Sequence, residues 1–283
     1  MIFAFGLLGF LTATSIGVDD SAANVDPGVS SSHSPSLHVV LSTYGSIGNY
    51  STDTKSRSLS GYATLSSAWV DYYTVGYNSL WLERGDAGGK YYTQHLVSAR
   101  ASKFFPPRIT LTAHYAYLDE GEIQSFSART IFHWMGGGVS YWFSPFQVAG
   151  SSFTLSHSGG EIATSIVRGF FFFEVTGGIW ATTTAILSNA SWTPSLFSMH
   201  QTISIPFGNS NFLVATAGAG RRAFYFDDEN LILYNQRVVQ TRFVQAKAIV
   251  NIAGGFYVIP SFEYNGHDEY SATYGSLGLR VVF

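Results

Sequence analysis

Apolar and polar residues alternate along most of the chain after residue 35, and they rarely form blocks. In the segment 108–118 the odd positions run from Ile109 to Tyr117 without a charge, while the even positions include Thr110 and His114. Side chains two positions apart share one face of a β-strand. The segment therefore predicts a strand with one apolar and one polar face.

About fourteen segments of this kind follow one another, each about 9 to 16 residues long. A β-strand needs about 9–11 residues to cross a membrane at a tilt. The predicted strands cover 36–50, 59–70, 73–84, 91–103, 108–118, 129–143, 146–156, 162–175, 179–188, 195–207, 211–226, 238–252, 256–265 and 271–283.

The connections between these segments alternate between two kinds. One kind is short and covers 71–72, 105–107, 144–145, 176–178, 208–210 and 253–255. The other is longer and polar and covers 51–58, 85–90, 119–128, 157–161, 189–194, 227–237 and 266–270. Short turns on one side and longer loops on the other are typical of transmembrane β-barrels. We therefore predict an all-β fold, an antiparallel up-and-down barrel of about fourteen strands with both chain ends in the periplasm.

A barrel of this size encloses a lumen, because eight strands already give an interior that side chains just fill. A Lys or Arg facing lipid near the midplane costs about 2–4 kcal/mol, so the charged faces are expected to point inward. The predicted lumen-lining residues are Arg100, Arg108, His114, Arg168, Glu174, His200, Lys247, Glu263 and Arg280. Basic residues exceed carboxylates in this set, which suggests a weak preference for anions. Alternatively, these side chains only hydrate the lumen or pair across strands.

One segment resists this assignment of faces. Both parities of 211–226 are apolar or small, so the sequence does not say which side points inward.

Elsewhere aromatic residues concentrate near strand ends, for example Trp81, Trp142 and Tyr264. Rings at such positions are expected to form girdles at the level of the lipid headgroups.

Composition supports this class and excludes others. Charged residues make up only 12% of the chain, whereas soluble domains carry roughly 25%. The net charge of −3 argues against a nucleic-acid partner, which would require a basic face. The chain has no cysteine, which excludes disulfides and thiolate metal sites. We expect no cofactor.

The N-terminal region carries a separate signal. The apolar run 2–11 is too short to span a bilayer as a helix, which takes about 20 residues. We interpret 1–23 as a signal peptide, cleaved after Gly17 or Ala23, followed by a flexible leader at 24–35 and the barrel at 36–283. The alternative is a buried N-terminal segment that stays on the mature protein.

The C-terminal segment ends in an alternating apolar series, Gly275, Leu277, Leu279, Val281 and Phe283. This series resembles the ending of bacterial outer-membrane β-barrels, which close on a terminal Phe. The resemblance covers only the last nine or so residues, and the length and strand count are similar to those of monomeric porins. The C-terminal resemblance implies outer-membrane localisation, contact with outer-membrane lipid, and recognition by the barrel-assembly machinery through Leu277, Leu279, Val281 and Phe283.

Enzymatic and metal sites find little support. In barrel lipases and deacylases the catalytic Ser follows the His by two positions, whereas Ser156 and Ser158 are each adjacent to His157. Adjacent residues of a strand point to opposite faces, so a nucleophile and its base would not meet. The His residues at 95, 114, 133 and 200 lie on different segments without carboxylate spacing. The acidic stretches 119–122 and 227–229 are expected to be loops that hold Ca²⁺ weakly at most.

The leading hypothesis is a passive, porin-like pore for small hydrophilic solutes and not an enzyme. The alternative is a non-conducting barrel that anchors envelope protein partners. A transporter of apolar substrates is a third hypothesis, disfavoured because the leader is short for a plug.

Overall fold

The computed structural model describes residues 38–66, 71–84, 89–122, 130–143, 145–157, 160–190, 194–208, 210–222, 225–227, 232–234 and 238–283. The predicted signal peptide and leader lie outside this part of the chain. Among the residues described, no helix is long and apolar enough to cross a bilayer.

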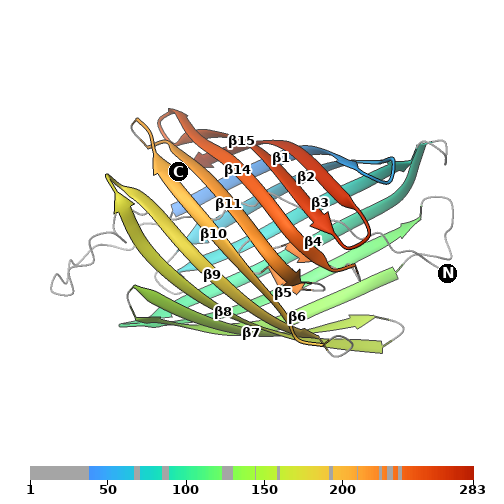
Figure 1. Cartoon of the computed structure of the whole chain (residues 1–283), viewed down its shortest axis with the longest axis horizontal. Helices are drawn as coiled ribbons and strands as arrows, with labels where there is room; N and C mark the ends of the chain where they lie inside the picture. The colour runs from blue at the N-terminus through green and yellow to red at the C-terminus, as the bar shows by residue number, and fades with distance from the viewer. Residues whose placement is uncertain are drawn as a thin grey trace.

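Fourteen strands form one closed antiparallel barrel, in which β1 pairs with β16 and the other strands pair in chain order (Figure 1). The two remaining strands, β12 (Tyr225–Asp227) and β13 (Ile232–Tyr234), form a separate hairpin between β11 and β14. The predicted fold class and strand count are confirmed. The barrel strands are β1 His38–Tyr50, β2 Thr54–Ser66, β3 Tyr72–Arg84, β4 Gly89–Phe105, β5 Ile109–Glu122, β6 Thr130–Phe143, β7 Phe146–His157, β8 Gly160–Thr176, β9 Ile179–Ala190, β10 Leu196–Pro206, β11 Phe212–Arg222, β14 Gln240–Ala253, β15 Phe256–His267 and β16 Ser271–Val282.

The alternation read from the sequence becomes the two faces of this wall. On β1 the side chain of Ile47 is 65% exposed on the outer face, whereas Tyr44 is 1% exposed on the inner face. The outer face carries large exposed hydrophobic side chains all around the barrel, such as Leu111, Val167 and Leu277. An exposed apolar surface of this extent requires an apolar surrounding.

The two ends of the barrel are built differently, and we name them by what they carry. The terminal rim holds His38, Phe283 and short turns such as Gly177-Gly178 and Gly254-Gly255. In both turns each glycine has a positive φ, between 37° and 87°. Two-residue hairpin turns of the type that matches strand twist need this conformation at both central positions.

The opposite end, the loop rim, carries the longest connection, between β11 and β14, but the predicted alternation is only partly right, because β1 and β2 are joined there by residues 51–53 alone while the terminal rim holds the five-residue connection 67–71. Both described chain ends therefore share one rim, which agrees with an even number of strands. Placement of that rim in the periplasm stays a prediction.

Aromatic side chains stack along the outer face at the terminal rim. Neighbouring ring centroids on β6, β7 and β8 lie 4.9–6.0 Å apart. The run consists of Tyr141, Phe143, Phe146, Phe171 and Phe173. Stacked rings at the end of an apolar wall are the arrangement of an interfacial girdle.

Several predicted boundaries are wrong, and the strand predicted at 211–226 ends at Arg222. Strand β2 begins at Thr54 and not at 59, because the charges of Lys55 and Arg57 point outward at the loop rim, where solvent tolerates them. Strand β5 continues to Glu122, so the predicted acidic loop at 119–122 is part of the wall. The hairpin β12–β13 replaces part of a predicted loop at 227–237, whose residues 228–231 lie outside the described part.

Candidate functional site

The inner wall of the barrel is the candidate site, because it gathers most of the ionisable side chains of the strands. Seven of the predicted residues occupy inward positions: Arg100, His114, Arg168, His200, Lys247, Glu263 and Arg280. Lys247 and Glu263 are each 4% exposed. Two others lie elsewhere. Arg108 is exposed in the turn before β5, where its guanidinium donates to the Tyr141 hydroxyl (3.4 Å). Glu174 is exposed at the terminal rim and accepts from the Gly178 amide (3.0 Å).

A continuous hydrogen-bonded network joins β10, β11, β14 and β15 near the loop rim. The Arg222 guanidinium lies 3.3 Å from the His200 imidazole, bonds to the Gln240 amide oxygen, and sits 4.5 Å above the Phe243 ring. Gln240 in turn donates to Asn265 (2.5 Å). We call His200, Arg222, Gln240, Gln245, Glu263 and Asn265 the inner polar network.

Glu263 is the only carboxylate in this network, and both of its oxygens accept a hydrogen bond. Asn265 donates to one oxygen at 2.5 Å, and Gln245 donates to the other at 3.1 Å. A buried charge is tolerated where several donors stabilise it. The network therefore holds a carboxyl and a guanidinium group within one fixed patch of the wall.

Sequence reasoning missed four members of the network. Arg222, Gln240, Gln245 and Asn265 were not predicted as lumen residues, and Arg222 lies in the segment whose faces looked alike. A signal for Arg222 was present nonetheless. It follows the Gly220-Arg221 pair, and one of two adjacent arginines must point inward on a strand.

A row of serine hydroxyls crosses the wall at the height of Lys247. In the strand register Lys247 pairs with Ser261, Ser261 with Ser276, Ser276 with Ser46, and Ser46 with Ser58. The hydroxyls of Ser261 and Ser276 are 2.6 Å apart, and those of Ser46 and Ser58 are 3.0 Å apart. This serine row gives the lumen a polar lining that carries no charge.

Apolar side chains also reach the lumen and break the polar lining. Near the loop rim, Tyr50, Tyr92, Tyr270 and Tyr274 pack with Leu80, Leu82 and Ala272. A second cluster, Tyr44, Val214, Ile249 and Ile259, lies further along the wall. The interior is thus mixed, with charged, hydroxylic and aromatic zones side by side.

Several inward polar atoms have no hydrogen-bond partner within the part of the chain that the structure describes. They include both amide atoms of Asn78, both amide atoms of Gln94, and the hydroxyls of Ser60 and Ser198. A polar group left without a partner costs about 1–3 kcal/mol. These atoms have almost no exposed surface, so only a water molecule buried within the wall would satisfy them.

The geometry of the described residues gives no support to a metal site or a catalytic site. No group of three or more potential metal ligands occurs among the described residues. The histidines His95 and His133 lie on the outer face, and each accepts or donates a hydrogen bond with a tyrosine, Tyr77 and Tyr115, at 2.9 Å. Ser158 and the side chains of Ser156 and His157 lie outside the description.

Comparison with known proteins places the fold. No family model matches the chain, and no curated protein matches its sequence. Among solved structures, a TodX monoaromatic hydrocarbon channel mutant aligns over 88% of this chain and 91% of its own, with a TM-score of 0.55 and 8% identity. The outer membrane protein Omp33 of Acinetobacter baumannii aligns over 87% of this chain and 99% of its own, with a TM-score of 0.50 and 11% identity.

A bacterial polysaccharide outer membrane secretin gives a similar result, with a TM-score of 0.50 and 9% identity over 87% of this chain and 98% of its own. Identities this low show the common fold and carry no residue-level assignment. The fold, the closed wall of fourteen strands and the apolar outer face agree on one class. The chain is a transmembrane β-barrel with the fold of bacterial outer-membrane proteins, and this fold supports the predicted location in the outer membrane.

Proposed function

We propose that the barrel is a passive pore for small polar solutes with a weak preference for anions. The observation that carries the proposal is the polar lining of the inner wall, which consists of the serine row and the inner polar network. Such a lining favours a hydrated lumen, because hydroxyl and amide groups that face it are stabilised by water or by a permeating polar solute.

The anion preference is supported by the charges on the inner wall. Inward cations outnumber inward carboxylates, and rings of Arg and Lys favour anions in pores. The described cations are Arg100, Arg168, Arg222, Lys247 and Arg280, against Glu120 and Glu263.

Conductance in planar bilayers tests this function. We expect discrete ion steps from the purified barrel and a reversal potential in a KCl gradient that indicates anion preference. Lys247→Glu should move that potential toward cation preference, whereas Arg57→Glu on the outer face should leave it unchanged. A barrel that inserts but shows no ion steps would contradict the proposal.

A non-conducting scaffold barrel is the second candidate, and the aromatic cluster near the loop rim favours it. Tyr50 and Tyr274 share a hydrogen bond between their hydroxyls (3.1 Å), and Tyr92 donates to Glu120 (2.6 Å). Tied aromatic side chains of this size narrow a lumen. Silent bilayers together with partners that co-purify in fixed ratio would support the scaffold over the pore.

We infer from the sequence that the chain is not an enzyme, because a His and a Ser that are adjacent in a strand would face opposite sides. Phospholipid hydrolysis by the purified barrel in mixed micelles would refute this inference.

We further infer that β16 is the segment recognised by the assembly machinery. Its Leu277 and Leu279 face outward, and the Phe283 amide donates to Val39 (2.9 Å) at the seam. Phe283→Ala should lower the amount of folded barrel in cells without lowering its stability once folded.

A further inference from the structure

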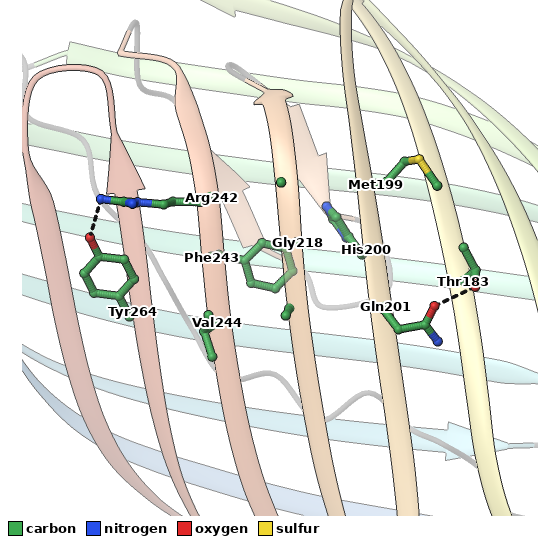
Figure 2. Close-up of a pocket in the computed structure, with 11 residues that line it drawn as sticks. Thr183, Met199, His200, Gln201, Gly218, Arg242, Phe243, Val244 and Tyr264 are labelled. Atoms are coloured by element: carbon green, nitrogen blue, oxygen red, sulfur yellow. Dashed lines mark hydrogen bonds between the residues drawn. The ribbon is translucent and has the colours of Figure 1, made fainter. Parts of the chain in front are cut away.

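Small side chains hollow the outer face of β11 near the loop rim. Ala217 and Ala219 point outward there, with Gly218 between them. In the register, Ala219 lies between Met199 on β10 and Arg242 on β14. A groove of about 360 Å³ results, with the larger neighbours as its sides (Figure 2).

One side of the groove carries an exposed cation. Arg242 is the third residue of β14, its guanidinium donates to the Tyr264 hydroxyl (3.3 Å), and it lies 5.7 Å from the centre of that ring. No carboxylate forms an ion pair with Arg242 within the described ranges. An outward Arg near a membrane interface costs about 0–1 kcal/mol, so this position suits a headgroup anion.

A polar pair lies one outward position deeper. Gln201 pairs with Ala217, one step of two residues below Ala219, which is about 7 Å along the strand. Thr183 donates to the Gln201 amide oxygen (2.7 Å; Figure 2). The Gln201 amide nitrogen also reaches the Thr202 carbonyl at 3.4 Å. That nitrogen carries two hydrogens, so a second one can donate to a ligand carbonyl.

The order of these groups matches the order of groups in a phosphorylated lipid. A guanidinium stands at the rim, an amide donor lies below it, and an apolar surface of Ala217, Val244 and Met199 surrounds them. A phosphate, an ester or amide carbonyl and an acyl chain follow in the same order. Arg binds phosphate with two parallel hydrogen bonds, which gives geometric selectivity as well as affinity.

We propose that this groove is a specific binding site for lipid A, the phosphorylated glycolipid of the outer leaflet. Arg242 holds a phosphate, Gln201 donates to an acyl-linkage carbonyl, and an acyl chain lies on Ala217 and Ala219. Arg221, exposed one position beyond the groove and 3.6 Å from Asp268, offers a second cation to the sugar phosphates. The choice of lipid A rests on the predicted outward orientation of the loop rim and does not depend on whether the barrel conducts.

Native mass spectrometry of the detergent-solubilised barrel, titrated with lipid A, tests the site. We expect one retained lipid A per barrel. Arg242→Gln removes the phosphate contact and Ala219→Leu fills the groove, so each should weaken retention about tenfold, the equivalent of about 1.4 kcal/mol. Arg57→Gln is the matched control, because Arg57 is also an outward Arg of the loop half, 3.4 Å from Glu83.

Three results would overturn the proposal. The first is loss of lipid A retention in Arg57→Gln equal to that in Arg242→Gln, which would indicate general attraction to rim charges. The second is phosphatidylglycerol retained as strongly as lipid A. The third is unchanged retention in both groove variants. Strand content by circular dichroism and single-channel conductance, measured on the same samples, keep a folding or pore defect distinct from loss of the lipid.

Discussion

The inner wall differs sharply between two arcs of the same barrel. The hydroxyl arc is the inner face of β2, whose inward side chains all carry a hydroxyl: Thr54, Ser56, Ser58, Ser60, Tyr62, Thr64 and Ser66. The charged arc is the inner polar network of β10, β11, β14 and β15. A hydroxyl is satisfied by one neighbour or one water, whereas a buried charge needs several fixed partners. The two arcs therefore differ in how strongly their residues depend on one another.

The largest difference between the arcs is expected at their glycines. Gly220 has a φ of +118°, and a Cβ there would lie 2.4 Å from the Ser198 Cα and 2.5 Å from the Phe197 carbonyl oxygen. Backbone atoms cannot move aside, so Gly220→Val should lower the free energy of unfolding by about 3 kcal/mol or more.

Urea unfolding in lipid vesicles measures the effect, and Gly45 provides the matched control. A Cβ at Gly45 on β1, beside the hydroxyl arc, has no atom within 4 Å. Gly45→Val should change the stability by no more than about 0.5 kcal/mol. Equal losses at both glycines would show that the backbone of β11 is not specially constrained.

A smaller effect is expected from Arg222, the centre of the charged arc. Arg222→Met keeps much of the volume above the Phe243 ring but removes the bonds to Gln240 and His200. Hydrogen bonds to charged groups contribute about 1.5–3 kcal/mol each, but Met also removes the cost of burying a charge, so a net loss of about 2–3 kcal/mol in unfolding free energy is expected.

The same variant should also weaken the preference for anions in bilayer recordings. Arg221→Met, on the neighbouring outward position, serves as control and should alter neither property. If Arg222→Met keeps the full free energy of unfolding, the inner polar network contributes no more to stability than the hydroxyl arc does.

The smallest effect is expected in the hydroxyl arc itself. Ser58→Ala removes one hydrogen bond, the 3.0 Å contact between the Ser58 and Ser46 hydroxyls. Ser46 still pairs in register with Ser276, the next member of the serine row. The unfolding free energy should fall by about 0.5–1.5 kcal/mol, and the reversal potential in a salt gradient should stay where it was. A shift of the reversal potential would show that the hydroxyl arc also selects ions.

Much of the fold could be predicted because strand residues obey local rules. Parity alone separated Ile109 and Leu111 from Thr110 and His114, and alternate short turns fixed the strand count. Where both parities are small, as in Ala215-Thr216-Ala217-Gly218, the rule gives no answer. The inward position of Arg222 followed only from its partners on β10 and β14.

The candidate site was harder to predict for a related reason. A single sequence shows which residues can face a lumen, but not which strands their side chains join. The link from His200 through Arg222 and Gln240 to Asn265 spans 65 positions of the chain and depends on register. The outer groove likewise depends on three strands at once, because the small side chain of Ala219 leaves a hollow only where Met199 and Arg242 flank it.

The seam between the first and last strands is paired over eleven residues, from Val40 with Val282 to Tyr50 with Ala272, as many as join β15 to β16. The Phe283 amide reaches Val39 at the same rim where β14 turns into β15 through two glycines. A Gly-Gly linker between these ends would therefore reproduce a turn that the protein already uses elsewhere. The barrel is therefore suited to circular permutation, in which these ends are joined and another turn is opened. Such a variant would change the order in which the hairpins are synthesised while the folded barrel stays the same.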